Sequence, residues 1–367
     1  MQLPNNEYLN THSLSRLFNN MSESYKIFWF KAVVEHVSKG ETELSFDVLI
    51  NSMIKNAWYM VTEYRLNLGP SDTLEKAVKH IQEISSIKSA AKDSDILAFI
   101  ESCEDKQVKE FKRVLTLNVP YRLQAPFMPE ITSDIWKSTA ASTQYINMQQ
   151  DLIYGFDYGK GLDKKVLIKK PWADYIQANA GILLGWIDYN LITYLQKRNP
   201  SVPGIANKIN PPQERKLESA KAYWKAVITA KPIPNIYTDD IMTIKDISID
   251  HFVPWSYVAH DELWNLVPTT RSINSSKSNN LPKWDVYFPR LCSVEYAAYE
   301  LVQEYDHIKD LHKVVTKCMK EHLNDEDIRY RLYQSNQTKE HFGNQLKEII
   351  LPAYESAKKM GFGEWII

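Results

Sequence analysis

Five residues between positions 250 and 277 carry the side chains that hydrolysis of a phosphodiester needs. Asp250 and His251 are adjacent, and Asn265, Asn274 and Lys277 follow the histidine by 14, 23 and 26 positions. A neutral imidazole can take a proton from water near pH 7, and carboxylate and amide oxygens are ligands for hard divalent cations. A lysine beside them supplies a positive charge for a phosphate. The set therefore indicates metal-assisted phosphodiester cleavage.

The elements that must position these residues are two strands and a short helix. Residues 247–253 alternate apolar and polar side chains and are rich in β-branched types, which predicts a strand. Residues 263–270 form a second short apolar run, and a polar loop joins the two as a hairpin-like pair. The helix predicted next carries Asn274 and Lys277 on one face, one turn apart. Two strands and a helix are therefore expected to converge on one point.

The complete pattern, Asp-His-x-x-Pro followed by two asparagines and a lysine, resembles the ββα-metal motif of the HNH endonucleases. The resemblance covers about residues 235–290, and its spacing is similar to that of the HNH domain within RNA-guided CRISPR effectors. It implies a bacterial, metal-dependent endonuclease whose products carry a 5′-phosphate and a 3′-hydroxyl.

The resemblance also implies a role for each residue. His251 would be the general base, and Asp250 and Asn274 would bind one divalent cation per site, Mg²⁺ or Mn²⁺. Asn265 would bond to backbone, hold the loop and orient His251, and Lys277 would contact the phosphate. Taken singly, each residue has an ordinary structural interpretation: a packed histidine, two turn asparagines and a solvated lysine.

One common feature of the family is missing from the sequence. Many HNH proteins hold this core with two Cys-x-x-Cys pairs around a structural zinc. Here the cysteines are Cys103, Cys292 and Cys318, which are far apart in sequence, so no structural zinc is expected. The core is instead expected to be held by packing against nearby aromatic residues, namely Trp255, Trp264, Trp284, Tyr287 and Phe288.

The predicted fold class is mainly α with a small α+β insert, with helical domains that flank the ββα core. Residues 1–204 are expected to form a helical N-terminal domain, either a scaffold or a module for target recognition or partner docking. Residues 205–290 would form the nuclease core with a basic lead-in helix, and residues 291–367 a helical C-terminal segment. In the N-terminal part, a stretch with three prolines at 119–129 predicts an extended connection. The predicted helical stretches there are 25–33, 44–66, 73–87, 94–115 and 172–195.

The formal net charge of −1 means that any surface for a nucleic acid must be local. Residues 208–231 lead into the core and hold six basic residues against two acids. Arg215, Lys221 and Lys225 from this segment, together with Arg271, are the candidate nucleic-acid contacts, although a solvated helix face has the same composition. A second basic concentration comprises Lys160, Lys164, Lys165, Lys169 and Lys170.

Composition also bears on location and partners. The chain contains no apolar run of eighteen residues, and its cysteines are few and scattered, so we expect a cytoplasmic protein with no membrane partner. DNA is the expected partner. It would be cut as nicks, or as double-strand breaks where two active sites meet, for example in a homodimer.

The sequence therefore predicts a metal-dependent HNH endonuclease that acts on DNA. Residues 8–30 loosely resemble bacterial HNH proteins of anti-phage systems, which suggests a role in defence against foreign DNA. One alternative is a gated nuclease subunit of a multi-protein defence complex, which the near-neutral charge favours. The other is a non-catalytic nucleic-acid-binding scaffold, against which the intact Asp250, His251 and Asn274 argue.

Overall fold

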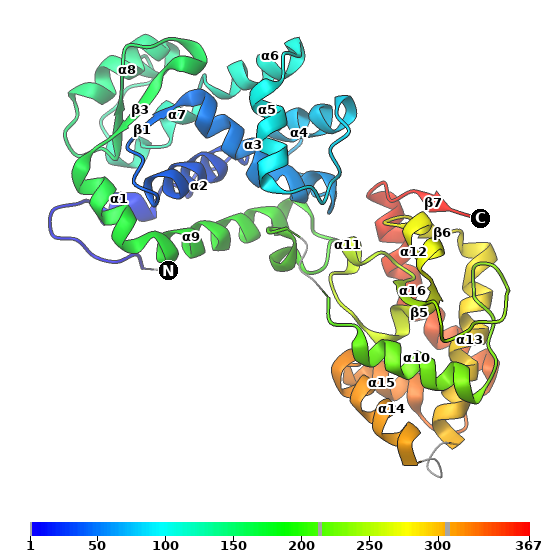
Figure 1. Cartoon of the computed structure of the whole chain (residues 1–367). Coiled ribbons are helices and arrows are strands. Elements are labelled where there is room, and N and C mark those ends of the chain that lie inside the picture. Colours follow the sequence, from blue (N-terminus) through cyan, green and yellow to red (C-terminus); the bar gives the residue numbers. More distant parts are fainter. Residues whose placement is uncertain (1, 212–214, 305–308) are drawn as a thin grey trace. The chain divides into compact units, whose positions relative to one another are not determined.

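The computed structural model describes residues 2–211, 215–304 and 309–367. As predicted, the described chain is mostly helical with small sheets. It divides into two compact units (Figure 1). Unit 1 comprises residues 1–200 and 205–212, and unit 2 comprises residues 201–204 and 213–367. The proline- and glycine-containing segment 199–204 lies at this boundary.

Unit 1 is a group of helices with one small sheet. Strands β1 (Glu43–Ser45), β3 (Lys165–Ile168) and β2 (Tyr154–Phe156) pair in that order, both pairs antiparallel. The long helix α9 (Lys170–Arg198) packs against α2 (Tyr25–Val37). The remaining helices are α1 (Thr11–Ser15), α3 (Phe46–Thr62), α4 (Thr73–Ile84), α5 (Asp93–Ser102), α6 (Lys106–Leu115), α7 (Val119–Arg122) and α8 (Thr139–Met148).

Two differences from the predicted elements of unit 1 have local causes, a helix cap in one case and the position of prolines in the other. The predicted stretch 94–115 is two helices, because Asp105 accepts hydrogen bonds from the backbone of Gln107 and Val108 and starts α6. The segment 119–129 is not extended: it contains α7 and a 3₁₀ turn at Ala125–Phe127. Each of these has a proline in its first turn, where the missing N–H costs no hydrogen bond.

Unit 2 is built around a β-hairpin and a short helix. Strand β4 (Ile247–His251) pairs antiparallel with β5 (Leu266–Thr270), and α12 (Arg271–Lys277) follows directly. Thr270 caps α12, since its side chain accepts a hydrogen bond from the Ile273 amide. The other elements are α10 (Glu218–Ala230), α11 (Trp255–Val258), β6 (Leu281–Pro282), α13 (Trp284–Glu304), α14 (Lys309–His322), α15 (Glu326–Tyr333), α16 (Lys339–Lys359) and β7 (Glu364–Trp365).

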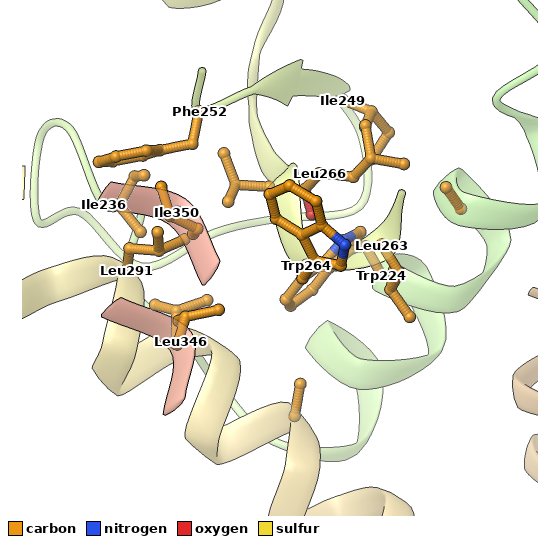
Figure 2. Close-up of a cluster of buried hydrophobic side chains, with 14 of the residues drawn as sticks. Trp224, Ile236, Ile249, Phe252, Leu263, Trp264, Leu266, Leu291, Leu346 and Ile350 are labelled. Carbon is orange, nitrogen blue, oxygen red and sulfur yellow. The ribbon is translucent and has the colours of Figure 1, made fainter. Parts of the chain in front are cut away.

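One hydrophobic core holds unit 2 together. Its members come from the hairpin, from α10 and from the C-terminal helices, and Figure 2 shows Leu266 of β5 in the same cluster as Leu291 of α13 and Ile350 of α16. Trp224 of α10 donates a hydrogen bond from its indole to the Leu266 carbonyl at 2.8 Å. Residues on either side of position 290 thus share a core. The division of this region into a nuclease core at 205–290 and a helical C-terminal segment at 291–367 stays a prediction.

The described helices include none with the length and apolar character that a membrane-spanning segment needs.

Candidate active site

The hairpin and α12 bring the predicted site residues together. Asp250 and His251 end β4, Asn265 immediately precedes β5, and Asn274 and Lys277 lie on α12. The Lys277 ammonium is 3.1 Å from a carboxylate oxygen of Asp250 and donates to the carbonyl of His251 at 2.7 Å. The fold therefore places a carboxylate, an imidazole, an amide and an ammonium around the end of one strand.

Asp250 is buried and has a partner on each carboxylate oxygen. The Tyr237 hydroxyl donates to Oδ2 at 2.5 Å, and Lys277 donates to Oδ1. Burial and the neighbouring Asp250 charge raise the pKa of Tyr237 well above its usual value, so the phenol keeps its proton and acts as a donor. Asn235 positions Tyr237, because its amide binds the Tyr237 backbone N–H and the Thr269 hydroxyl on β5.

Lys277 is fully buried, with 0% of its side chain exposed. Burial lowers its pKa, and the nearby Asp250 carboxylate opposes that shift. Its two hydrogen bonds, to Asp250 and to the His251 carbonyl, link α12 to the end of β4. In this arrangement Lys277 positions the two residues on either side of the Asp250–His251 peptide bond.

The His251 ring is held from both sides. Its Nε2 is 2.8 Å from the Asp261 carboxylate, and its Nδ1 is 3.2 Å from the Arg215 guanidinium. Burial alone would raise the pKa of Asp261, but its hydrogen bond to His251 and the nearby positive charges together lower it. Asp261 therefore accepts, and Nε2 carries the ring proton. Burial lowers the pKa of His251 itself, which favours the neutral ring. Nδ1 is then the basic nitrogen, and Arg215 donates to its lone pair.

Asp261 is a site residue that the sequence reasoning did not select. It lies ten positions after His251 in the loop between the strands, and a carboxylate in that loop was the one available signal. The loop is fixed by α14 and the residues after it: His322 binds the Asp261 carbonyl at 2.8 Å. The Asn324 side chain donates to the neighbouring Glu262 carboxylate at 2.8 Å. His322 and Asn324, which are distant from Asp261 in sequence, thus position the loop that carries it.

We expect Asp261→Asn to lower kcat on the order of 10- to 100-fold with little change in KM. The substitution removes the negative charge that holds the proton on Nε2 and that, with His251 as the expected general base, would stabilise the protonated ring. Steady-state cleavage kinetics measure the effect. Asp285→Asn, an exposed site on α13, is the matched control and should behave as the wild type. A kcat equal to that of the control would show that Asp261 does not contribute to cleavage.

Asn265 closes the base of the hairpin loop. Its side chain is fully buried, and its amide accepts from the Val253 N–H at 2.8 Å and donates to the Val253 carbonyl at 2.9 Å. The Asn265 carbonyl also accepts from the Phe252 N–H, so the residues directly after His251 are tied to the start of β5.

Replacing Asn265 with alanine should destabilise the protein by about 2 kcal/mol or more, because two buried backbone groups of Val253 lose their partners. Urea unfolding midpoints measure the change. The exposed Asn344→Ala substitution on α16 should shift the free energy of unfolding by less than about 0.5 kcal/mol. Equal stability of the two variants would show that the hydrogen bonds between the Asn265 side chain and Val253 do not stabilise the fold.

Asn274 has a free oxygen that suits a hard cation. Its Nδ2 donates to the Ile249 carbonyl at 3.0 Å and to the Ser248 hydroxyl at 2.9 Å. A carbonyl can only accept, so this contact fixes which end of the amide is nitrogen. Among the described residues no donor binds the opposite oxygen, Oδ1. A carboxylate also has lone pairs beyond its two hydrogen bonds, so Asp250 and Asn274 fit a cation whose remaining ligands are water and phosphate.

The described residues contain no cluster of three or more histidine, cysteine or acidic side chains arranged for a metal. A site made of one aspartate and one asparagine contains only one such side chain and would not form a cluster of this kind. The three cysteines, Cys103, Cys292 and Cys318, are all unpaired thiols.

The candidate nucleic-acid contacts lie at different places. Arg215 reaches the site, where it binds His251 and lies over the Trp255 ring, 5.7 Å from its centroid. Lys221 and Lys225 are on α10 and form no ion pair with the described site residues. Arg271 is exposed at the start of α12 and lies 3.9 Å from Asp246. The structure thus brings one of the four candidates to the histidine.

Residues 235–283 match the family model described as HNH endonuclease. This segment contains the hairpin, α12 and the Tyr237 loop. No curated protein and no solved structure matches the chain. The match of residues 235–283 to the family model shows that the chain has an enzyme domain of the phosphodiester hydrolase class. More particularly, it carries an HNH endonuclease domain, and the protein is a nuclease.

Proposed function

We propose that this protein is a metal-dependent endonuclease that cuts DNA at the site formed by Asp250, His251 and Asn274. The observation that carries the proposal is their joint placement on a ββα unit within the segment that matches the HNH family. The basic nitrogen of His251, the paired carboxylate of Asp250 and the free oxygen of Asn274 each have the chemistry that their roles require.

In the proposed mechanism, His251 accepts a proton at Nδ1 from the water that attacks the phosphorus. Asp261 keeps the other ring proton on Nε2 and stabilises the positive ring that results. Lys277 holds Asp250 and the His251 backbone in place, and Asn265 fixes the loop that follows. These residues together set the direction from which the water is activated.

Asp250 and Asn274 would hold the divalent cation, either Mg²⁺ or Mn²⁺, since both ions suit oxygen ligands. When bound, the cation polarises the phosphate and stabilises negative charge on the leaving oxygen. The predicted role of Lys277 as a direct phosphate contact stays a proposal, and its buried contacts support a positioning role instead.

DNA is the proposed substrate, with Arg215, Lys221, Lys225 and Arg271 as candidate phosphate contacts. Incubation of the protein with supercoiled plasmid, single-stranded DNA and RNA tests this choice. We expect nicking or linearisation of the plasmid with Mg²⁺ or Mn²⁺ and none with EDTA. Cleavage restricted to RNA would contradict the substrate, and cleavage that persists in EDTA would contradict the metal.

One contact favours the alternative of a gated nuclease. Arg215 donates to Nδ1 of His251, the nitrogen that must be free to accept a proton from water. Substrate or a partner protein would have to draw Arg215 away, most simply onto a phosphate. Under this proposal Arg215→Ala raises the basal cleavage rate relative to wild type, whereas a decrease identifies Arg215 as a phosphate contact alone.

The biological setting that we propose is cytoplasmic bacterial defence against foreign DNA, supported by the loose resemblance of residues 8–30 to anti-phage HNH proteins. Expression of the wild-type protein in a bacterial host should lower phage plaque numbers, and expression of His251→Ala should not. Equal plaque numbers for both would contradict the defence role. A homodimer would allow two sites to make a double-strand break.

A further inference from the structure

Unit 1 contains a cavity of ≈ 850 Å³ that is lined by residues of α3, α6, α7, α8 and the loop that joins β2 to β3. Its size falls within the usual range for small-molecule sites. Its lining combines aromatic and apolar side chains with cations, hydroxyls and amides. The residues that matter here are Phe46, Tyr121, Thr143, Tyr158, Lys160 and Lys164.

The central feature of this cavity is a buried lysine without a carboxylate partner. Lys164 is 8% exposed, and its ammonium donates to the Thr143 hydroxyl at 2.5 Å. The ammonium also lies 5.4 Å from the ring centroid of Tyr121 and 5.2 Å from that of Phe156. No described acidic side chain forms an ion pair with it. Burial lowers the pKa of Lys164, and the charge of Asp157, which also lines the cavity, opposes that shift from beyond ion-pair distance. Buried charges in proteins are normally paired, so this ammonium is arranged to meet an anion from outside the chain.

The rim of the cavity adds a second cation and exposed apolar surface. Lys160 lines the cavity and has no ion-pair partner in the described part of the chain. Tyr158 is 92% exposed, Met148 67% and Leu117 40%, which groups three exposed large hydrophobic side chains around one opening. Exposed aromatic and apolar groups gathered at a concave site mark a ligand surface.

The loop that carries Lys160 has a fixed shape. A Cβ atom at Gly159 would lie 2.9 Å from the Lys164 Cα, so the backbone approaches closely there. Gly161 has φ +58°, in the left-handed region that favours glycine. The Asp157 carboxylate accepts from the backbone N–H groups of Gly159 and Lys165. The backbone positions of the two cavity lysines are therefore fixed by local contacts.

The other lysines of this basic concentration are engaged elsewhere. Lys165 lies 3.4 Å from Glu43, Lys169 donates to the carbonyls of Gln149 and Gln150, and Lys170 pairs with Asp174. The five lysines thus do not form one stripe, and two of them serve the cavity.

We propose that this cavity binds a nucleotide, with its phosphate at Lys164 and Lys160 and its base against the aromatic wall. An anion satisfies the buried ammonium, and a planar ring suits the surface of Tyr158, which is exposed at the opening of the cavity. The choice of a nucleotide over other aromatic anions rests on the proposed action on DNA. The ligand is a free nucleotide or a nucleotide unit of a DNA strand, because both present the same chemistry.

Binding is tested on the full-length His251→Ala protein, so that strand cleavage does not consume the probe. The probes are the four deoxynucleoside monophosphates, measured by calorimetry, and a fluorescent single-stranded oligonucleotide, measured by anisotropy. Lys164→Met in this background should weaken binding on the order of 10- to 100-fold, the loss expected for a hydrogen bond to a charged group. Lys165→Met, at the next residue but outside the cavity, should leave binding unchanged.

The two sources of the ligand give different results. Monophosphate binding that depends on Lys164 identifies a free nucleotide as sufficient. Binding of the oligonucleotide alone, with the same dependence, identifies a nucleotide within a strand. Equal effects of Lys164→Met and Lys165→Met on both probes would overturn the proposal.

Two further measurements separate ligand binding from a structural role. Lys164→Met should not lower the thermal midpoint, because an apolar side chain of similar size replaces a charge that has no carboxylate partner. Tyr158→Ala changes an exposed side chain and should weaken binding without affecting folding. A large loss of stability in the first variant with unchanged binding in the second would assign Lys164 to the fold. Plasmid cleavage by the wild-type protein is measured separately. A protein that does not cleave DNA can therefore still be tested for nucleotide binding in the cavity.

Discussion

Replacing His251 with alanine is expected to lower the rate of DNA cleavage by about 10²- to 10⁴-fold while DNA binding is retained. The alanine has no nitrogen to accept the proton of the attacking water, whereas the residues expected to hold the cation and the phosphates are unchanged. Single-turnover cleavage of a labelled duplex gives the rate, and anisotropy with the same duplex in EDTA gives the affinity.

The matched control for this experiment is His341→Ala, an exposed histidine in the first turn of α16 in the same unit. It should cleave at the wild-type rate. If His251→Ala also cleaves at that rate, the general base is another residue. This result would support the alternative in which the ββα unit binds nucleic acid without catalysing its cleavage. A parallel loss of binding and cleavage would instead point to a folding defect, which the unfolding midpoint of the variant reveals.

Replacing Lys277 with methionine is expected to destabilise the protein by about 3 to 5 kcal/mol. The Lys277 ammonium is fully buried beside Asp250, so its removal leaves a buried carboxylate with no opposing charge. The His251 carbonyl also loses a hydrogen bond at 2.7 Å. Chemical unfolding of the full-length protein measures the loss, and Lys283→Met, an exposed lysine before α13, is the control.

A double variant shows whether the loss arises from the pair. Asp250→Asn combined with Lys277→Met removes both charges, and replacing a buried pair by neutral groups is often close to neutral. The double variant should therefore lose less stability than the sum of the two single variants. Strict additivity would mean that the two side chains do not interact in the folded protein.

The part of the site that the sequence predicts is the part encoded within a short segment. The alternation at 247–253 and the short apolar run at 263–270 are local signals. Each contains the strand that forms, β4 over Ile247–His251 and β5 over Leu266–Thr270, and the helix predicted next is α12. Because β4, β5 and α12 follow one another directly, residues at fixed offsets along them must meet. This is why Asp250, Asn274 and Lys277 could be predicted as neighbours.

The other contacts depend on residues that are distant in sequence. Tyr237 reaches Asp250 because Asn235 bonds to both Tyr237 and Thr269, and no spacing rule connects these four positions. Asp261 reaches His251 because His322, the last residue of α14, and Asn324, just after that helix, hold the loop from a distant part of the sequence. The cavity of unit 1 has the same origin, since Lys164 meets Thr143 and Tyr121 only after the sheet and helices have packed.

In the mechanism that we propose, this HNH site hydrolyses DNA to a 5′-phosphate and a 3′-hydroxyl with the aid of a divalent cation. The most direct test is to nick a supercoiled plasmid with the wild-type protein and Mg²⁺, remove the protein, and treat the nicked circles with DNA ligase alone. We predict that ligase reseals the nicks, because it requires these two end groups, and that His251→Ala produces no nicks to reseal. Nicks that ligase cannot close would contradict the proposed end groups, and equal nicking by His251→Ala would contradict the proposed role of His251 as the general base.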